Sequence, residues 1–316
     1  MRLNKLESLR VAFVFCLVIL LSGTAVHAQD QNDNAIRVGV NLVLIDATVK
    51  TKTGQIMDDL KKENFEVRED GKPQKIDVFS RDALPLSVAL VLDLSDSIGP
   101  FLGPLRDAAR TTLASLKSED EVALFTFSTE AQLRIPFTHD KTKIAEEIGN
   151  FKAGGATNIN DGIFEAAKYL LTGPQNGRRV IILISDDVGT SAGGEGTKDI
   201  VTEATAAGAA LYNLKIPGEN SATTIMYASM IPGLVSIHRV MDQTGGEIFD
   251  VKNVKDLDVT FKALVQRIKT RYTLGYYTNA TGEMGKPHKL DVRLGPSFGT
   301  KGKNYIVLSK NGFYVQ

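Results

Sequence analysis

Apolar and polar residues alternate in the first part of the chain and again near its end. Alternation over residues 36–49 predicts a strand, and because both sets of alternating positions are apolar, we expect burial on both faces. Asp70-Gly71 separates the alternating runs 65–67 and 76–78. This predicts a β-hairpin, since Gly accepts the positive φ that such a turn needs. Further strands are predicted at 272–277, 290–294, 305–308 and 313–315.

The middle of the chain, about residues 86–270, has a different pattern. Short apolar runs predict strands, and stretches with apolar residues every three or four positions predict helices. Strands that alternate with helices form a mostly parallel sheet with helices on both faces, so we expect an α/β domain with a Rossmann-like open sheet. The predicted strands are 88–92, 122–127, 180–184 and 210–216, and the predicted helices are 105–116, 144–151, 163–171, 200–207, 234–241 and 259–268.

Each β-rich flank is too short for an independent sandwich, which needs about seven strands. The two ends of an open α/β domain often lie close together. We therefore predict that residues 29–84 and 271–316 pair into one β-sandwich-like domain, and that residues 85–270 form an α/β domain inserted into it. The alternative is that the flanks are two separate β-extensions.

The first 28 residues have the features of a secretory signal peptide. Three basic residues precede an apolar run over residues 11–21, and Val26 and Ala28 supply the small residues before a cleavage site after Ala28. The run is shorter than the roughly 20 residues that span a bilayer, although an uncleaved membrane anchor remains the alternative. Cys16, the single cysteine, lies in this segment. We expect an exported protein, periplasmic or secreted, with no disulfide and no transmembrane segment after cleavage.

Composition excludes several classes of protein. Lys plus Arg and Asp plus Glu both number 37, so the formal net charge is zero. Nucleic-acid binders usually carry a large basic excess, and we expect no nucleic-acid partner. The hydrophobic share of 43% is ordinary for a globular protein and excludes a disordered chain or a polytopic membrane protein.

Hydroxyl and carboxylate side chains follow two predicted strands of the sheet. Asp93, Ser95 and Ser97 come directly after strand 88–92, and Asp186 comes after strand 180–184. Thr157 lies in a Gly-rich loop before a predicted helix. Functional groups gather at the carboxyl ends of parallel strands, so we expect these five side chains to meet. Taken singly, such residues are more often helix caps and turn formers, and a metal-free domain remains the alternative.

These three motifs, in this order, resemble the von Willebrand factor A-type domain and its metal-ion-dependent adhesion site. The resemblance covers about residues 86–270. The flanks resemble a bacterial family of secreted proteins related to this domain, typical of acidobacteria: residues 43–49 and 64–74 are similar to its N-terminal part, and residues 274–277 to its C-terminal part.

The resemblance implies that Ser95, Ser97 and Thr157 give hydroxyl oxygens to a divalent ion, while Asp93 and Asp186 act mostly through water. Oxygen donors at about 2.1 Å in an octahedron suit Mg²⁺, with Mn²⁺ or Ca²⁺ as possible substitutes. If neutral hydroxyls are the direct ligands, much of the ion's charge is left uncompensated. An open coordination position would then attract an Asp or Glu carboxylate of a protein partner.

The sequence departs from the family's pattern at two positions. Ile98 stands where many members carry Met, and Asp187 stands where a Gly commonly follows the aspartate. Asp187 could therefore compete with Asp186 as the carboxylate on the metal side. A second direct carboxylate would weaken the attraction of the ion for a partner's acid.

Two loops near the expected metal edge are candidate partner-binding segments. Residues 188–196 are rich in Gly, and residues 217–233 are long for an α/β connection, which is often a sign of function. If exposed, the apolar residues of the second loop would form a binding patch; if folded back, they would be core. The residues concerned are Met226, Tyr227 and Met230, and Asp187 is a further candidate for partner binding.

We therefore predict a non-enzymatic adhesion module that recognises a protein partner through a divalent cation. The alternative is a structural or envelope-assembly factor that docks through its β flanks, with the metal only stabilising loops. A phosphatase of the haloacid-dehalogenase-like type would use Asp93 as nucleophile, but Ser95 occupies the place of its general acid and cannot supply that proton. We expect surface or capping roles for the remaining histidines, His139, His238 and His288.

Overall fold

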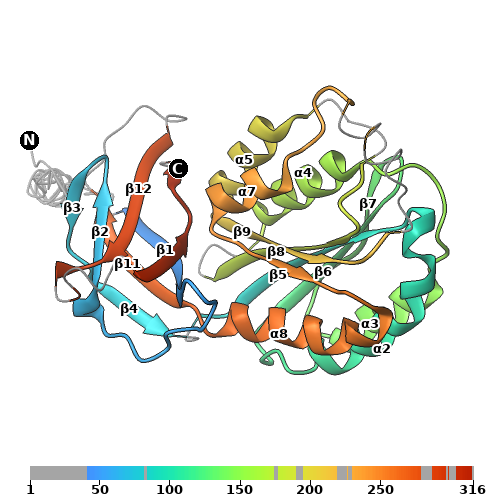
Figure 1. Ribbon diagram of the computed structural model, residues 1–316, viewed down its shortest axis with the longest axis horizontal. Helices are drawn as coiled ribbons and strands as arrows, with labels where there is room; N and C mark the ends of the chain where they lie inside the picture. The colour runs from blue at the N-terminus through green and yellow to red at the C-terminus, as the bar shows by residue number, and fades with distance from the viewer. Residues whose placement is uncertain are drawn as a thin grey trace, which may run out of the picture. The chain divides into compact units, whose positions relative to one another are not determined.

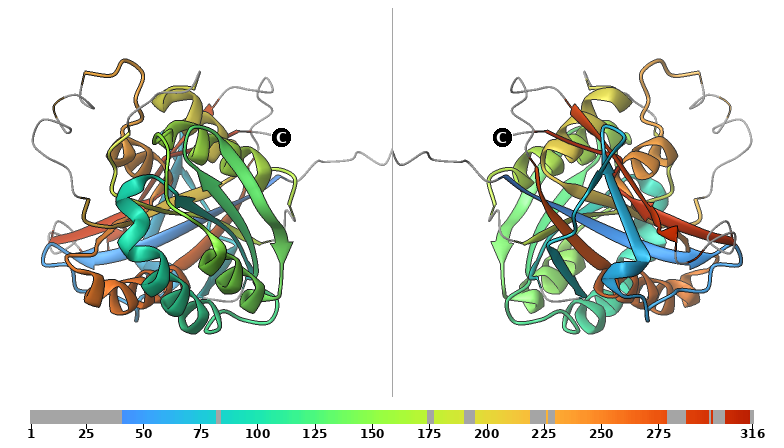
Figure 2. Two further views of the ribbon diagram at one scale, coloured as in Figure 1. Left: turned by 90° about the vertical axis from the view of Figure 1, so that its right-hand side faces the viewer. Right: turned by 90° about the vertical axis from the view of Figure 1, so that its left-hand side faces the viewer.

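The computed structural model describes residues 41–81, 84–173, 177–189, 195–218, 226, 230–278, 287–296, 298 and 304–314 (Figures 1 and 2). The predicted signal peptide and its cleavage site lie outside these residues. The strands are β1 (Asn41–Thr51), β2 (Phe65–Glu69), β3 (Lys72–Gln74), β4 (Val78–Arg81), β5 (Leu86–Asp93), β6 (Glu121–Phe127), β7 (Ala131–Thr138), β8 (Arg178–Ser185), β9 (Ala209–Lys215), β10 (Ile248–Asp250), β11 (Tyr272–Thr278), β12 (Pro287–Leu294), β13 (Tyr305–Ser309) and β14 (Gly312–Tyr314). The helices are α2 (Leu102–Leu113), α3 (Lys141–Asn150), α4 (Ile159–Leu170), α5 (Thr197–Ala206), α7 (Ile237–Thr244) and α8 (Leu257–Lys269), with short 3₁₀ turns η1 (Lys62–Asn64), η2 (Asp96–Phe101) and η3 (Val254–Asp256).

The α/β part contains a six-stranded sheet in the order β10-β9-β8-β5-β6-β7. All its pairings are parallel except that of β7 with β6. Every residue of β5 and β8 is buried, as the continuous apolar runs predict for central parallel strands. The predicted mostly parallel α/β fold is confirmed.

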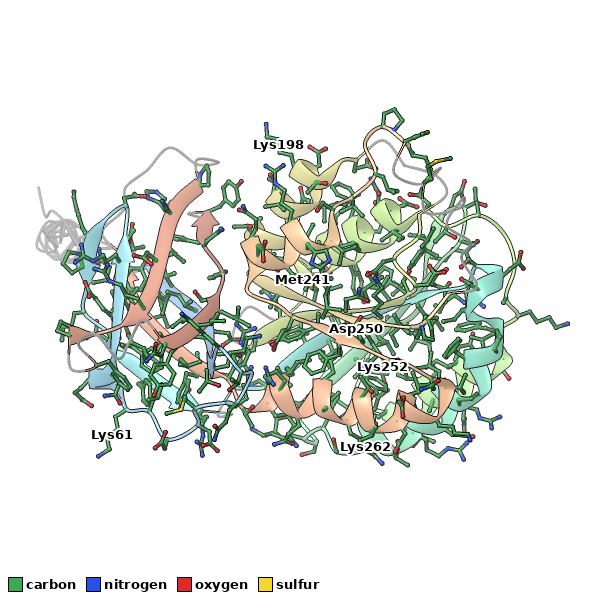
Figure 3. All side chains as sticks on the ribbon, viewed as in Figure 1. Lys61, Lys198, Met241, Asp250, Lys252 and Lys262 are labelled. Carbon is green, nitrogen blue, oxygen red and sulfur yellow. The ribbon has the colours of Figure 1, made fainter. Side chains whose placement is uncertain are left out.

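Helices cover both faces of this sheet (Figure 1). One face packs against α2, α3 and α8, and the other against α4, α5 and α7. Figure 3 shows Met241 of α7, which is 4% exposed, and Lys262 of α8, whose side chain is half exposed. The sheet is therefore the middle layer of three.

Several elements of this part differ from the sequence prediction: strands β7 and β10 were not predicted, and helices α2 and α7 are each shifted by three residues. The edge strand β7 was not expected, because it buries only Ile135 and pairs with β6 through an irregular register. Helix α7 begins and ends three residues later than predicted. The Ser236 side chain accepts a hydrogen bond from the N–H of Arg239 at its start, and Gly245, with φ 78°, caps its end.

The two flanks of the chain form two antiparallel four-stranded sheets, in the orders β13-β1-β11-β4 and β14-β12-β2-β3. In both sheets, strands from before the α/β part pair with strands from after it: β1 with β11 and β13, and β2 with β12. One hydrophobic cluster contains residues of both sheets, among them Ile45, Val67 and Leu290. The predicted β-sandwich-like domain built from both flanks is confirmed.

Two details of this sandwich test the sequence prediction. The hairpin between β2 and β3 turns at Asp70 and Gly71, with φ of 48° and 82°, as predicted from the Asp-Gly pair. Its second strand is Lys72–Gln74 and not the predicted run 76–78, since Val78 belongs to β4 of the other sheet. Burial of the first strand on both faces is wrong at its start, since Leu42 is 42% exposed while Val43 and Ile45 are buried.

A buried charge network joins the sandwich to the α/β part, both of which belong to the unit Val40–Gln316. The Asp46 carboxylate accepts hydrogen bonds from Arg178 Nε at 2.8 Å and Thr273 Oγ1 at 2.9 Å. Arg271, 1% exposed, donates to the Asp46 carbonyl at 2.8 Å and to the Tyr212 hydroxyl at 2.6 Å. Burial opposes ionisation of Asp46, but the two guanidinium groups leave its pKa below the ordinary value.

Among the described residues, no helix is both long enough and apolar enough to cross a bilayer.

Gly245 offers a test of how tightly the two parts pack. A Cβ at this position would lie 2.4 Å from the carbonyl carbon of Ser309, at the end of β13, and the residue has positive φ. We expect Gly245→Ala to lower the free energy of unfolding by about 1–2 kcal/mol for the backbone conformation and by about 1–3 kcal/mol more for overpacking. Gly54 has φ 91° but open space around it, so Gly54→Ala should show the backbone cost alone. Equal losses for both variants in urea unfolding would contradict the close contact.

Candidate functional site

Asp93 is the buried centre of the predicted site. Strands β5 and β8 pair in parallel register, Leu92 beside Ile184, so their carboxyl ends are adjacent. Asp93 is 1% exposed. Its Oδ1 accepts the N–H of Ser95 at 2.8 Å, and its Oδ2 accepts the Ser185 hydroxyl at 2.8 Å. One carboxylate therefore ties the loop after β5 to the end of β8.

The loop after β5 brings two hydroxyl groups together. Ser95 Oγ and Ser97 Oγ lie 3.0 Å apart, about the separation of adjacent ligands around a small octahedral ion. The turn η2 begins directly after Ser95. Ile98, which replaces the family's common Met, is fully buried in the core beneath the loop.

The loop that carries Thr157 contacts the Ser95 loop through the backbone. The N–H of Gly154 donates to the Leu94 carbonyl at 2.7 Å, and the N–H of Asn158 donates to the Ser128 carbonyl at 2.7 Å. Thr157 itself is 4% exposed, and the Asn158 side chain accepts the N–H of Asp161 at the start of α4. The structure thus brings two of the three predicted motifs into direct contact.

The two aspartates after β8 have different surroundings. Asp186 is 5% exposed, and its carboxylate accepts the N–H of Val188 at 3.0 Å. Asp187 has φ 65°. Its Oδ1 accepts Asn213 Nδ2 at 2.6 Å, and Lys215 Nζ lies 3.5 Å from its Oδ2. Both of these partners belong to β9, so the Asp187 carboxylate is held on the β9 side of the loop.

Burial opposes the ionisation of two carboxylates at this edge, Asp93 and Asp187. Burial raises the pKa of Asp93 to about 6, the hydrogen bonds from Ser95 and Ser185 oppose the rise, and the neighbouring Asp186 adds to it. Burial also raises the pKa of Asp187, against the effect of Lys215 and Asn213. A cation at this edge would relieve the cost of ionising Asp93. The donors are all oxygens, a set that suits Mg²⁺.

The predicted partner-binding residues are described only in part. Met226 and Met230 are 48% and 64% exposed, whereas Tyr227 lies outside the described residues. The same loop returns to the site at Leu234, whose Cδ1 occupies the space that a Cβ of Gly189 would need. The returning segment therefore packs on the loop that follows Asp186.

Sequence reasoning missed Asn160, which is fully buried in the first turn of α4. Its Nδ2 donates to the carbonyls of Glu195 and Gly233 at 2.6 and 2.8 Å, and its Oδ1 accepts the N–H of Val235 at 2.9 Å. One amide thus fixes the ends of both loops that were predicted to bind a partner. The one sequence signal for this role of Asn160 was its position three residues after Thr157.

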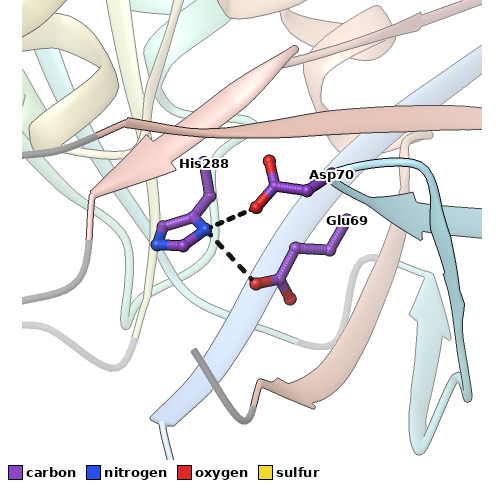
Figure 4. A group of neighbouring side chains, drawn as sticks. All are labelled: Glu69, Asp70 and His288. Atoms are coloured by element: carbon purple, nitrogen blue, oxygen red, sulfur yellow. Dashed lines mark hydrogen bonds and ion pairs between the residues drawn. The ribbon is translucent and has the colours of Figure 1, made fainter. Parts of the chain in front are cut away.

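A second polar group lies in the sandwich, far along the chain from the predicted site (Figure 4). His288 Nδ1 is 2.8 Å from Asp70 Oδ2 and 3.6 Å from Glu69 Oε1. The expected surface or capping role of His288 did not include these contacts, which arise from a strand pair formed across 218 positions of sequence. Local spacing in the sequence carries no signal of such a contact.

Comparisons with known proteins found a family model that matches a portion of the α/β part. Residues 88–189 match the profile of the von Willebrand factor type A domain. No curated protein matches the chain.

Similar solved structures include a mutant form of the PilB minor pilin from Streptococcus sanguinis, with 14% identity, coverage of 72% of this chain and 78% of that one, and a TM-score of 0.45. The conserved hypothetical protein BatB from Bacteroides thetaiotaomicron has 18% identity, coverage of 58% and 97%, and a TM-score of 0.43. Proximal thread matrix protein 1 from the mussel byssus has 14% identity, coverage of 64% and 51%, and a TM-score of 0.47. At these identities and scores, the three structures say nothing about what this chain binds.

The raised pKa of Asp93 predicts how the metal-free protein responds to pH. The folded state keeps the Asp93 proton up to about pH 6, while the unfolded chain releases it near 3.8. The contribution of Asp93 to the free energy of unfolding therefore falls as pH rises between these values and stays low above them. In EDTA at pH 7.5, Asp93→Asn should be more stable than the parent by up to about 3 kcal/mol, and at pH 4.5 by much less. Urea unfolding at the two pH values measures this, and an Asn variant no more stable than the parent at pH 7.5 would refute it.

Proposed function

This chain contains a von Willebrand factor type A domain, and we propose that it is an exported, non-enzymatic binding module that recognises a protein partner through a divalent cation. The observation that carries the proposal is the pair of hydroxyls of Ser95 and Ser97, 3.0 Å apart, beside the buried Asp93 carboxylate. The Thr157 loop is hydrogen-bonded to the same segment.

In this proposal, Ser95, Ser97 and Thr157 hold the ion through their hydroxyl oxygens, while Asp93 and Asp186 orient them and the waters of the ion. The ion is Mg²⁺, with Mn²⁺ or Ca²⁺ as substitutes, since all donors are oxygens. It supplies a positive charge that the neutral hydroxyls do not cancel. An Asp or Glu carboxylate of the partner is the ligand that such a charge favours.

The position of Asp187 supports partner binding by the ion. An additional carboxylate on the metal would neutralise it, but Asn213 and Lys215 engage the Asp187 side chain instead. We therefore assign the metal-side role to Asp186. The exposed Met226 and Met230 belong to the loop that packs beside Gly189 and offer apolar contacts to the same partner.

A binding role without catalysis agrees with the groups at this edge. A phosphatase mechanism at Asp93 needs a general acid two residues later, and Ser95 stands there with its hydroxyl 3.0 Å from that of Ser97. An alcohol group does not give up its proton at neutral pH. Export follows from the predicted signal peptide.

The ligand assignment predicts the effect of removing both hydroxyls. Mg²⁺ at about 100 times its dissociation constant should stabilise the parent by about 2.7 kcal/mol, and Ser95→Ala with Ser97→Ala should abolish this gain. Ser115 and Ser118 are exposed and precede β6, at the opposite edge of the sheet, so their double Ala variant is a matched control. Differential scanning calorimetry with Mg²⁺ or EDTA makes the measurement. An unchanged Mg²⁺ response in the Ser95/Ser97 variant would overturn the assignment.

The same variants test partner recognition. Bait chain immobilised with Mg²⁺ should capture a protein from the native envelope fraction, release it in EDTA, and fail to capture it after the Ser95/Ser97 change. Capture that persists in EDTA would favour docking through the β flanks, with the metal only stabilising loops.

The assignment of Asp186 rather than Asp187 predicts a second contrast. Asp186→Asn should weaken Mg²⁺ binding by about 10- to 100-fold, because it removes a charge beside the ion. Asp187→Asn should change it by less than about threefold, since Asn tolerates positive φ and the side chain contacts β9. Isothermal titration of both variants with Mg²⁺ compares them, and a larger loss in Asp187→Asn would reverse the two roles.

A further inference from the structure

Glu69, Asp70 and His288 form a compact group on the sandwich, at the end of β2 and the start of β12 (Figure 4). One ligand atom from each side chain lies within 4.8 Å of the other two. The group runs from core to solvent: the side chains of Glu69, His288 and Asp70 are 8%, 16% and 51% exposed. It is independent of the edge that carries Ser95.

The spacing of these atoms fits one metal ion. Ligands about 2.0–2.1 Å from a zinc ion lie about 3.3 Å apart in a tetrahedron. His288 Nδ1 is 2.8 Å from Asp70 Oδ2 and 3.6 Å from Glu69 Oε1. Small movements of exposed Asp70 would bring all three atoms to coordination distance.

A separate observation concerns the hydroxyl of Tyr276, on β11. Tyr276 is 1% exposed, and its hydroxyl makes no hydrogen bond of ordinary geometry with the described residues. Burial raises the pKa of Tyr276, and a side-chain hydrogen bond to Glu69 and the charges of Glu69 and Asp70 raise it further. When an ion binds the carboxylates, the Tyr276 hydroxyl can donate a hydrogen bond to an oxygen of one of them. Outer partners of metal ligands orient the ligands in this way.

The donor types select the ion. One imidazole nitrogen with two carboxylates is a mixed set that suits Zn²⁺, whereas Mg²⁺ and Ca²⁺ prefer oxygen alone. We propose that Glu69, Asp70 and His288 form a Zn²⁺ site that joins the β2–β3 hairpin to β12. Binding requires the lone pair of Nδ1, so the proton on that atom leaves it when the ion binds.

The position of the site in the chain gives it a consequence for stability. Asp70 and His288 are 218 positions apart, and the whole α/β part lies between them. A metal link that closes so long a loop restricts the unfolded chain strongly. The single cysteine lies in the predicted signal peptide, so an exported chain without a disulfide would gain in this site a cross-link between its two flanks.

The test uses the full chain with Ser95→Ala and Ser97→Ala, which removes the proposed Mg²⁺ site. Titration with ZnCl₂ should show one equivalent bound to this parent. Asp70→Asn and His288→Gln should each weaken that binding by more than about 100-fold. His238→Gln, at an exposed position of α7, is the matched control and should bind as the parent does. Unchanged Zn²⁺ affinity in both test variants would overturn the proposal.

Two further measurements make the result decisive. Asn keeps the turn at Asp70, because it tolerates φ near 48°, so Asp70→Asn decides the question if His288→Gln fails to fold. Zn²⁺ should raise the melting temperature of the parent and of His238→Gln, but not of Asp70→Asn. In chains with intact Ser95 and Ser97, the Mg²⁺ response should survive Asp70→Asn, so that failure of either metal site is seen separately.

Discussion

The antiparallel pairing of β1 with β11 holds together parts of the chain that are separated by the entire α/β domain. The Asp46 carboxylate on β1 accepts a hydrogen bond from Arg178, the first residue of β8. The Asp46 carbonyl accepts one from Arg271, which precedes β11. Both guanidinium groups are almost fully buried, and a buried charge that loses its partner costs several kcal/mol. The strand pair and the charge network therefore depend on each other. The β1–β11 pairing positions Asp46 beside Arg178 and Arg271, and these arginines fix where the α/β domain is attached to the sandwich.

The attachment and the candidate site lie at opposite ends of the central strands. The network lies at the amino ends of β5 and β8, whereas Asp93 and Asp186 lie at their carboxyl ends. Strands rise about 3.3 Å per residue, so the eight residues of β8 separate the two by about 25 Å. The sandwich is therefore attached at the amino ends of these strands, and the candidate site lies at their carboxyl ends.

Much of this architecture follows from local pattern. The continuous apolar runs of β5 and β8 identify central parallel strands, and Asp70-Gly71 identifies its hairpin, because these signals arise within a few residues. Strand β7 was not predicted, since it lies at an edge and its exposed positions are polar. The grouping of Glu69 and Asp70 with His288 could not be predicted either, because it depends on the pairing of β2 with β12. The motif residues were found by order along the chain, but the engagement of Asp187 by Asn213 and Lys215 required the neighbouring strand β9.

The place of β13 in its sheet has a consequence for incomplete chains. This strand is the outer neighbour of β1 and follows the α/β part in the chain. A polypeptide truncated before Tyr305 would leave the backbone of β1 unpaired along that side, and such an edge recruits strands from other molecules. Premature termination before β13 would thus produce an aggregation-prone species rather than a shorter working protein.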